Sequence, residues 1–175
     1  ELDSAQLNWT VDNTPTDASK GIFGCWIKRA KLTSASGGNQ TILAGGSAES
    51  SVYQINTDDK LLATDDGLAA TISTQVFRDP TAWFHLLYSY DSDEGTAANR
   101  LKPYINGVEV TVFDTDGRSN IGAAEAWGIT QDAQIQTWGD GPNANKDFDG
   151  YMAQAFIIDG LSIQNGDYAV SDFID

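Results

Sequence analysis

Apolar and polar residues alternate with a period of two along most of this chain, and that pattern restricts the fold more than any other feature. The alternation recurs in short runs, whereas the spacing of an amphipathic helix hardly appears. Asp, Gly and Asn clusters separate the runs, and 20 of the 25 acidic residues are Asp, whose short carboxylate favours turns. Short strands with frequent turns predict an all-β antiparallel sandwich or barrel.

The alternating runs mark the expected strands. They cover residues 6–11, 21–30, 40–45, 52–56, 60–64, 70–76, 83–91, 100–106, 108–114, 134–139 and 150–159, with a helical turn expected in 167–174. Asn106-Gly107 favours a tight hairpin, because these two residues adopt the positive φ angles of a type I′ turn. The run 83–91 is apolar on both faces, which indicates a central strand.

Composition limits the classes of protein that remain. A length of 175 residues, with 41% hydrophobic residues, predicts one globular domain over 1–175. No apolar run reaches the ~20 residues of a membrane helix, so we expect no membrane insertion. A net charge of −15 would repel a phosphate backbone, which argues against a nucleic-acid partner. The single Cys25 excludes an intrachain disulfide and is expected to be buried.

Six segments occur in an order that resembles a known family. They are Trp26-Ile27-Lys28-Arg29-Ala30, Gln40-Thr41-Ile42-Leu43-Ala44, Phe77-Arg78-Asp79-Pro80-Thr81-Ala82-Trp83-Phe84-His85, Tyr104-Ile105-Asn106-Gly107-Val108, Phe148-Asp149-Gly150-Tyr151-Met152-Ala153 and Phe156-Ile157-Ile158-Asp159-Gly160. Together they are similar to the concanavalin A-like, laminin-G-like jelly-roll domains of virion proteins from tailed phages, especially marine and cyanobacterial phages. The resemblance spans roughly residues 5 to 175.

The resemblance implies a two-sheet antiparallel jelly-roll sandwich in which a strand near the N-terminus pairs with one near the C-terminus. In similar phage proteins a further strand follows the Ile-Asp-Gly strand and returns beside the first strand. This sequence ends at Asp175, before such a strand. We therefore expect that the closing strand is either absent from the sequence given or supplied by a neighbouring chain.

The sequence carries no catalytic pattern that we recognise. Glucanases of this fold place two Glu close together on one strand, and no Glu here has a second Glu within six residues. The Asp pairs 91/93, 114/116 and 147/149 border turn residues. His85 lies within an apolar strand, and there is no Gly-x-Ser-x-Gly elbow. We therefore expect a structural histidine and no enzymatic activity, and a single His and a single Cys argue against zinc.

Calcium is the one cofactor that the sequence leaves open. Asp91-Ser92-Asp93-Glu94-Gly95 resembles a cation loop, but Lys102 stands where the bidentate Glu belongs, so a hairpin turn is the simpler interpretation. Pentraxins share this sandwich and hold calcium with two loops. By position, these loops correspond to residues 45–49 and 139–147 here, which makes Glu49, Asp140 and Asp147 candidate ligands; Lys146 weakens the match, and solvated turn residues are the alternative.

Sugar binding is the activity that this fold implies, and it needs an exposed aromatic ring beside amides or carboxylates. Trp9, Trp26 and Trp83 are expected in the core. Trp127 lies in a long segment without strand character, and Trp138 ends a strand beside a Gly-Asp turn. The alternative roles for Trp127 are to cover an open end of the sandwich or to contact another subunit. The candidate ligand-binding residues are Trp127, Trp138, Asn143 and Asn145.

Two functions from different classes follow. The first is a non-enzymatic structural protein of a bacteriophage virion, exposed on the capsid or tail, with other virion subunits as partners and host-surface glycans as ligands. The second is a secreted carbohydrate-binding module attached to a polysaccharide-degrading enzyme of a marine bacterium. Gene context separates them, because a virion protein is encoded beside capsid and tail genes. A glucanase with an unrecognised acid pair is a third interpretation.

Overall fold

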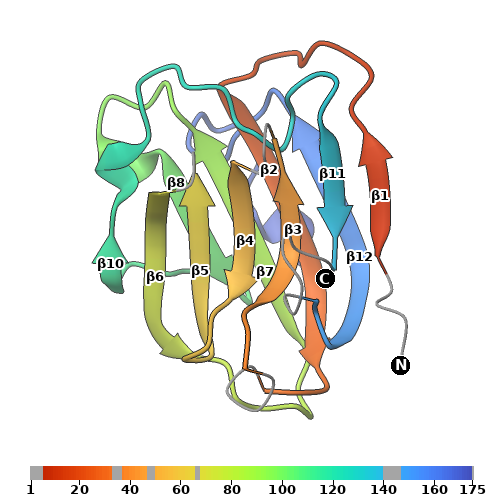
Figure 1. The fold of residues 1–175 in the computed structure, drawn as a ribbon. Helices are drawn as coiled ribbons and strands as arrows, with labels where there is room; N and C mark the ends of the chain where they lie inside the picture. The colour runs from red at the N-terminus through yellow and green to blue at the C-terminus, as the bar shows by residue number, and fades with distance from the viewer. Residues whose placement is uncertain (1–5, 33–36, 47–49, 66–67, 140–146, 175) are drawn as a thin grey trace.

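Two antiparallel sheets pack face to face in the computed structural model, which describes residues 6–32, 37–46, 50–65, 68–139 and 147–174 (Figure 1). The seven-stranded sheet has the order β1-β11-β3-β4-β5-β6-β10, and the five-stranded sheet has the order β12-β2-β7-β8-β9. The predicted all-β, two-sheet jelly-roll sandwich is confirmed.

The strands follow the alternating runs of the sequence. Their bounds are β1 Leu7–Thr10, β2 Lys20–Arg29, β3 Gln40–Gly45, β4 Ser51–Ile55, β5 Lys60–Asp65, β6 Leu68–Val76, β7 Phe84–Asp91, β8 Leu101–Ile105, β9 Val108–Glu109, β10 Phe113–Asp116, β11 Ile135–Trp138 and β12 Gly150–Asp159; the short 3-10 helices are η2 Ala97–Asn99, η3 Arg118–Asn120 and η4 Val170–Phe173. The helical turn expected in 167–174 is η4.

The expected strand 108–114 is wrong, because this segment forms two strands. β9 pairs with β8 in the five-stranded sheet, whereas β10 pairs with β6 in the seven-stranded sheet. The chain therefore crosses between the layers after Glu109. Periodicity continues through such a crossing, so the sequence pattern alone does not reveal it.

The hairpin predicted at Asn106-Gly107 is confirmed. Both residues have positive φ, 48° and 81°, and Ile105 pairs with Val108 across the turn. β7 is the middle strand of its sheet, between β2 and β8, and all eight of its residues are buried. This agrees with a central strand that is apolar on both faces.

Aromatic residues fill the space between the two sheets. Phe23 from β2 stacks on Tyr88 from β7, with ring centroids 5.2 Å apart, and meets Tyr53 from β4 edge-on at 4.5 Å. Trp127 enters this cluster from the segment between β10 and β11 and stacks on Tyr90 at 5.7 Å. Such edge-on and stacked pairs stabilise a core beyond the area they bury.

The outer face of the five-stranded sheet is covered in part by the C-terminal segment. Phe173 of η4 stacks on Phe156 of β12 with ring centroids 5.2 Å apart. Both rings belong to a cluster over Ile22, Leu87 and Tyr104, which are buried on that face. The cluster explains why β7 carries apolar residues on its outer face as well as its inner face.

The candidate functional site

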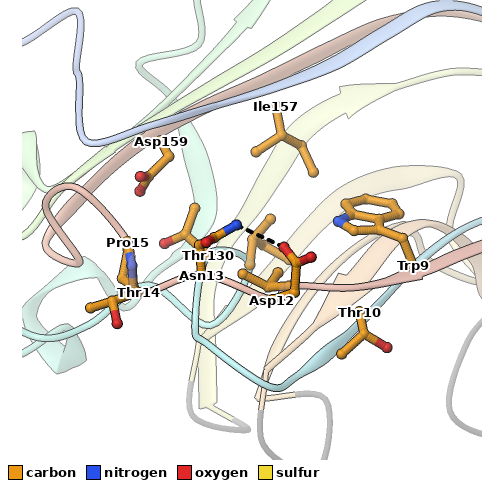
Figure 2. A pocket seen from close by; sticks show the side chains of 11 residues that line it. Trp9, Thr10, Asp12, Asn13, Thr14, Pro15, Thr130, Ile157 and Asp159 are labelled. Atoms are coloured by element: carbon orange, nitrogen blue, oxygen red, sulfur yellow. Dashed lines mark hydrogen bonds between the residues drawn. The ribbon is translucent and has the colours of Figure 1, made fainter.

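A pocket of about 280 Å³ lies on the side of the sandwich where the edge strands β1 and β12 of the two sheets face each other (Figure 2). β1 and the connection after it supply one wall, β12 supplies another, and the segment before β11 closes it. The volume is just below the roughly 300–1,000 Å³ typical of small-molecule pockets. Its lining residues are Trp9, Thr10, Val11, Asp12, Asn13, Thr14, Pro15, Ile129, Thr130, Ile157 and Asp159.

One aromatic ring and several planar polar groups face this pocket. Trp9 is half-buried, and its ring packs against the core on one side. Asp12 and Asn13 are exposed, and the Asn13 amide donates a hydrogen bond of 2.8 Å to the Asp12 carboxylate. In Figure 2 these two side chains lie between Trp9 and Asp159. An indole face beside amides and carboxylates is the combination that binds sugars.

Asp159 joins β12 to the β1–β2 connection. Its Oδ2 accepts a hydrogen bond of 2.6 Å from the backbone N–H of Thr16, across 143 residues of sequence. Its Oδ1 is buried and has no hydrogen-bond partner among the described residues. A buried acceptor without a donor costs free energy. Asp159 also lines the pocket, so its carboxylate contributes a negative charge there.

The segment after β10 positions the opposite part of the lining. The Trp127 backbone N–H donates to Ala18, 2.7 Å away, and the Trp127 carbonyl accepts from the Thr130 N–H at 3.1 Å and from its hydroxyl at 3.4 Å. Thr130 is 5% exposed and lines the pocket. Trp127 therefore supports the pocket from within the core.

The expectation that Trp127 offers an exposed platform for a sugar is wrong. Its side chain is 0% exposed, and its indole N–H donates a hydrogen bond of 2.7 Å to the hydroxyl of Tyr53. Burial raises the pKa of Tyr53, so that hydroxyl stays neutral. Trp127 thus belongs to the core between the sheets. The alternatives, that it covers an open end of the sandwich or contacts another subunit, stay predictions.

Trp138 is 7% exposed and lines a second groove, of about 450 Å³, with Leu7, Phe148 and Met152 among its neighbours. Its role in ligand binding stays a prediction. Asn143, Asn145, Glu49 and Asp140 lie outside the described residues. Asp147 is described and exposed, and the proposal that it binds calcium also stays a prediction.

The other tryptophans depart from expectation. Trp9 was expected in the core, yet it is half-buried and lines the pocket. Trp83 is 43% exposed, and its ring lies 6.4 Å from that of Tyr151 on β12. Trp26 is half-buried. For Trp9, the sequence signal was the polar stretch directly after a short N-terminal strand, Asp12 to Pro15.

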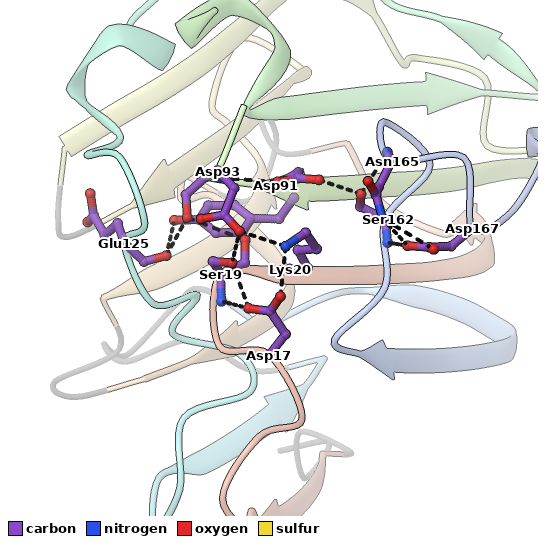
Figure 3. Close-up of polar contacts among 11 residues, drawn as sticks. Asp17, Ser19, Lys20, Asp91, Asp93, Glu125, Ser162, Asn165 and Asp167 are labelled. Atoms are coloured by element: carbon purple, nitrogen blue, oxygen red, sulfur yellow. Dashed lines mark hydrogen bonds and ion pairs between the residues drawn. The ribbon is translucent and has the colours of Figure 1, made fainter. Parts of the chain in front are cut away.

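A lysine ammonium occupies the acidic cluster that resembled a cation loop (Figure 3). Lys20 Nζ lies 2.7 Å from Asp17 and 2.6 Å from Asp93, and Asp91 accepts a hydrogen bond of 2.6 Å from the Ser162 hydroxyl. The hydrogen bond with Lys20 is the main reason that the pKa of Asp17 falls to about 2 and that of Asp93 is also lowered. The cluster is thus satisfied by the chain itself, in agreement with a turn.

No group of three or more His, Cys, Asp or Glu side chains with metal-binding geometry occurs in the part of the chain that the structure describes. Cys25 is fully buried, and burial raises its pKa, which disfavours the reactive thiolate. His85 is 1% exposed and packs edge-on against Trp26 at 5.3 Å. Burial lowers the pKa of His85, which favours the neutral ring of a structural histidine. Among the described residues, no helix is long and apolar enough to cross a bilayer.

No protein-family model and no curated protein matches this chain. Solved structures do resemble it. The heptameric SAP-like pentraxin of Limulus polyphemus superposes with a TM-score of 0.55 at 12% identity, covering 87% of this chain and 68% of the pentraxin. Trypanosoma rangeli sialidase gives a TM-score of 0.54 at 12% identity, over 80% of this chain and 20% of the sialidase.

The receptor-binding domain of botulinum neurotoxin mosaic serotype C/D superposes with a TM-score of 0.54 at 16% identity, over 85% of this chain and 35% of that domain. This chain thus spans about a fifth of the sialidase and about a third of the neurotoxin domain. At such low identity these likenesses show the fold, a lectin-like β-sandwich of the concanavalin A-like type.

Proposed function

We propose that this chain is a non-enzymatic carbohydrate-binding domain whose binding site is the pocket between β1 and β12. The observation that carries the proposal is the placement of the half-buried Trp9 ring in one pocket with the Asn13 amide and the Asp12 and Asp159 carboxylates. Trp9 would stack on the apolar face of a sugar ring, and Asp159, Asn13 and Asp12 would bind hydroxyl groups.

The arrangement of the two carboxylates supports binding without hydrolysis. A glycosidase needs one carboxyl group that is protonated at neutral pH, which an apolar environment usually provides. Here Asp12 is exposed to solvent, and both Asp12 and Asp159 accept hydrogen bonds from N–H groups. Neither carboxylate therefore lies in the apolar environment, free of N–H donors, that a general acid of this kind requires.

We further propose that the domain is a structural component of a bacteriophage virion, displayed on the particle surface, where it contacts other virion subunits and host glycans. The six ordered sequence segments and their resemblance to phage jelly-roll domains support this proposal. A shallow pocket with weak affinity for one sugar is useful when many copies are displayed on a particle, because multivalency raises the overall avidity.

The binding proposal is tested on a glycan array, followed by calorimetry with the best ligand. Removing the stacking surface with Trp9→Ala should weaken binding by about five- to tenfold, since an aromatic contact contributes about 1–1.5 kcal/mol. The matched control is Trp83→Ala, which removes another partly exposed tryptophan that does not line the pocket. It should leave affinity unchanged.

Trp9 also packs against the core, so the loss of binding in Trp9→Ala has to be separated from a loss of stability. Asn13→Ala provides the second variant, since Asn13 is exposed and its side chain bonds only Asp12 among the described contacts. It should lower affinity at unchanged melting temperature. Equal affinity in wild type, Trp9→Ala and Asn13→Ala would contradict this pocket, and product released from the bound polysaccharide would contradict a non-enzymatic role.

The virion proposal has a separate test. Antibodies against this domain should label intact phage particles, and soluble domain should compete with particles for adsorption to host cells. If the protein is instead found in culture supernatant joined to a polysaccharide hydrolase, the secreted carbohydrate-binding module is the correct assignment.

A further inference from the structure

We infer that the pocket between β1 and β12 selects sugars by charge: it favours neutral and, above all, amino sugars, and it rejects sugars that carry a carboxylate or sulfate. This inference rests on the proposed carbohydrate-binding function and names the class of ligand. It follows from the charges that line the pocket, which the fold brings together from both ends of the chain.

Among the described residues, the pocket lining contains two carboxylates and no basic side chain. Asp12 comes from the connection after β1, and Asp159 comes from the end of β12; the other nine lining residues are uncharged. Binding an acidic sugar in other proteins relies on Arg or Lys partners, because a carboxylate or sulfate needs charge-assisted hydrogen bonds. Here the described lining offers such an anion neutral hydroxyl and amide donors only, together with repulsion from two carboxylates.

The carboxylate of Asp159 also favours a ligand that can donate a hydrogen bond. Thr16 satisfies Oδ2 through a backbone N–H, whereas Oδ1 is buried without a partner among the described residues. A ligand hydroxyl or ammonium group can donate to an ionised carboxylate, whereas a ligand carboxylate has no proton to give at neutral pH. Donation from an ammonium is charge-assisted and about twice as strong as a neutral hydrogen bond.

The net charge of the whole chain favours the same class of ligand. The chain has 10 basic and 25 acidic residues, for a net charge of −15. A field of this sign lowers the local concentration of anionic ligands and raises that of cationic ones, and salt screens it. The sialidase similar in fold therefore gives no guide to the ligand here, since sialic acids are anionic sugars.

Three β-1,4-linked oligosaccharides of equal length, with the same ring and different charge, test the inference: oligoglucosamine, cello-oligosaccharide and oligoglucuronate. Calorimetry at about pH 5.5 keeps glucuronate negatively charged, because the ordinary pKa of a carboxyl group lies near 4. At low salt we expect oligoglucosamine to bind best and oligoglucuronate worst, with each step about three- to tenfold for a charge several ångströms away.

Variants separate the effect of the two pocket carboxylates on ligand preference from the effect of the protein's net charge. Asp12→Asn and Asp159→Asn should reduce the preference for oligoglucosamine over the neutral oligosaccharide by about three- to tenfold. Affinity for the neutral oligosaccharide should also fall, but by less, because an amide oxygen still accepts a hydrogen bond from a hydroxyl group. Asp58→Asn is the matched control, because Asp58 is exposed in the β4–β5 turn and does not line the pocket. It should leave the preference nearly unchanged.

The outcomes distinguish the two proposals. If oligoglucuronate binds as tightly as oligoglucosamine, or if Asp58→Asn alters the preference as much as Asp12→Asn and Asp159→Asn do, the charge inference is overturned while carbohydrate binding stands. If none of the three oligosaccharides binds and the glycan array finds no ligand, the proposed function itself is overturned, and the charge inference falls with it.

Discussion

Gly21 of β2 and Trp127 share one site in the sandwich: a Cβ atom built on Gly21 would lie 2.2 Å from Cε3 and Cζ3 of the Trp127 ring. The ring is 0% exposed and stacks on Tyr90 and Phe23, so it cannot move aside without disturbing both neighbours. The absence of a side chain at Gly21 is what allows the tryptophan, more than one hundred residues later, to enter the core.

Adding one methyl group at this contact should therefore destabilise the protein. We expect Gly21→Ala to lower the free energy of unfolding by about 1–3 kcal/mol, the usual cost of overpacking a core. Urea denaturation followed by tryptophan fluorescence measures it. Gly95→Ala is the control, since a Cβ there meets nothing within 4 Å, and it should change stability by less than about 0.5 kcal/mol. Equal stability of the two variants would contradict the packing described.

Replacing Trp127 by phenylalanine tests the buried hydrogen bond. Trp127→Phe keeps an aromatic ring but removes the N–H that donates to the Tyr53 hydroxyl at 2.7 Å. Leaving that buried acceptor without a donor, in a smaller packed ring, should lower the free energy of unfolding by about 1–3 kcal/mol. Sugar affinity should persist in the folded variant, unlike in Trp9→Ala. A folded Trp127→Phe protein that has lost sugar binding would place Trp127 in the ligand site after all.

A buried ion pair between the end of β2 and the β4–β5 turn provides a third prediction. Arg29 and Asp59 are both 0% exposed and lie 2.9 Å apart, and Asp59 also meets the largely exposed Arg78 at 2.8 Å. Asp59→Asn keeps the residue size and tolerates the positive φ of 61° at this position, but it leaves the buried guanidinium without its counter-charge. We expect a loss of about 3–5 kcal/mol.

The control for that pair is Arg78→Ala. The Arg78 side chain is 57% exposed, so its ion pair should contribute less than about 1 kcal/mol. Thermal denaturation of both variants at one protein concentration compares them. If Arg78→Ala destabilised the fold as much as Asp59→Asn, the main electrostatic partner of Asp59 would be Arg78 rather than Arg29.

Acid should weaken the cluster around Lys20. The pKa of Asp17 falls from its ordinary 3.8 to about 2, first because of its hydrogen bond with Lys20. A folded-state pKa below the unfolded value means that the contribution is fully present above about pH 4 and is lost as the pH falls towards about 2. Since Asp17 is 38% exposed, solvent screening limits the contribution to about 1 kcal/mol or less.

The comparison is between wild type and Lys20→Met. In this variant the pKa of Asp17 should return towards its ordinary value, so the variant should be less stable at neutral pH and should lose less stability between about pH 4 and pH 2. Urea denaturation at the two pH values measures the difference. Parallel losses in the two proteins would show that the pair with Lys20 does not set the acid response.

The sequence alone determined most of the strands, the Asn106-Gly107 hairpin and the all-β class, because a period of two and turn residues are properties of short segments. The expected strand 108–114 is the exception, since β9 and β10 pair in different sheets. It also identified the acid-rich stretch around Asp91 and Asp93 as a turn, although it did not show that Lys20 would lie between Asp93 and Asp17.

Only the tertiary structure decided which aromatic and acidic side chains meet. Trp127 lacks strand character in the sequence and is nevertheless buried, whereas Trp9 lies in a strand and lines a pocket. Asp159 reaches that pocket because β12 pairs with β2 and its carboxylate accepts from Thr16, 143 residues away. Exposure depends on which layer covers a residue, and the covering layer comes from distant parts of the chain, so no local pattern encodes it.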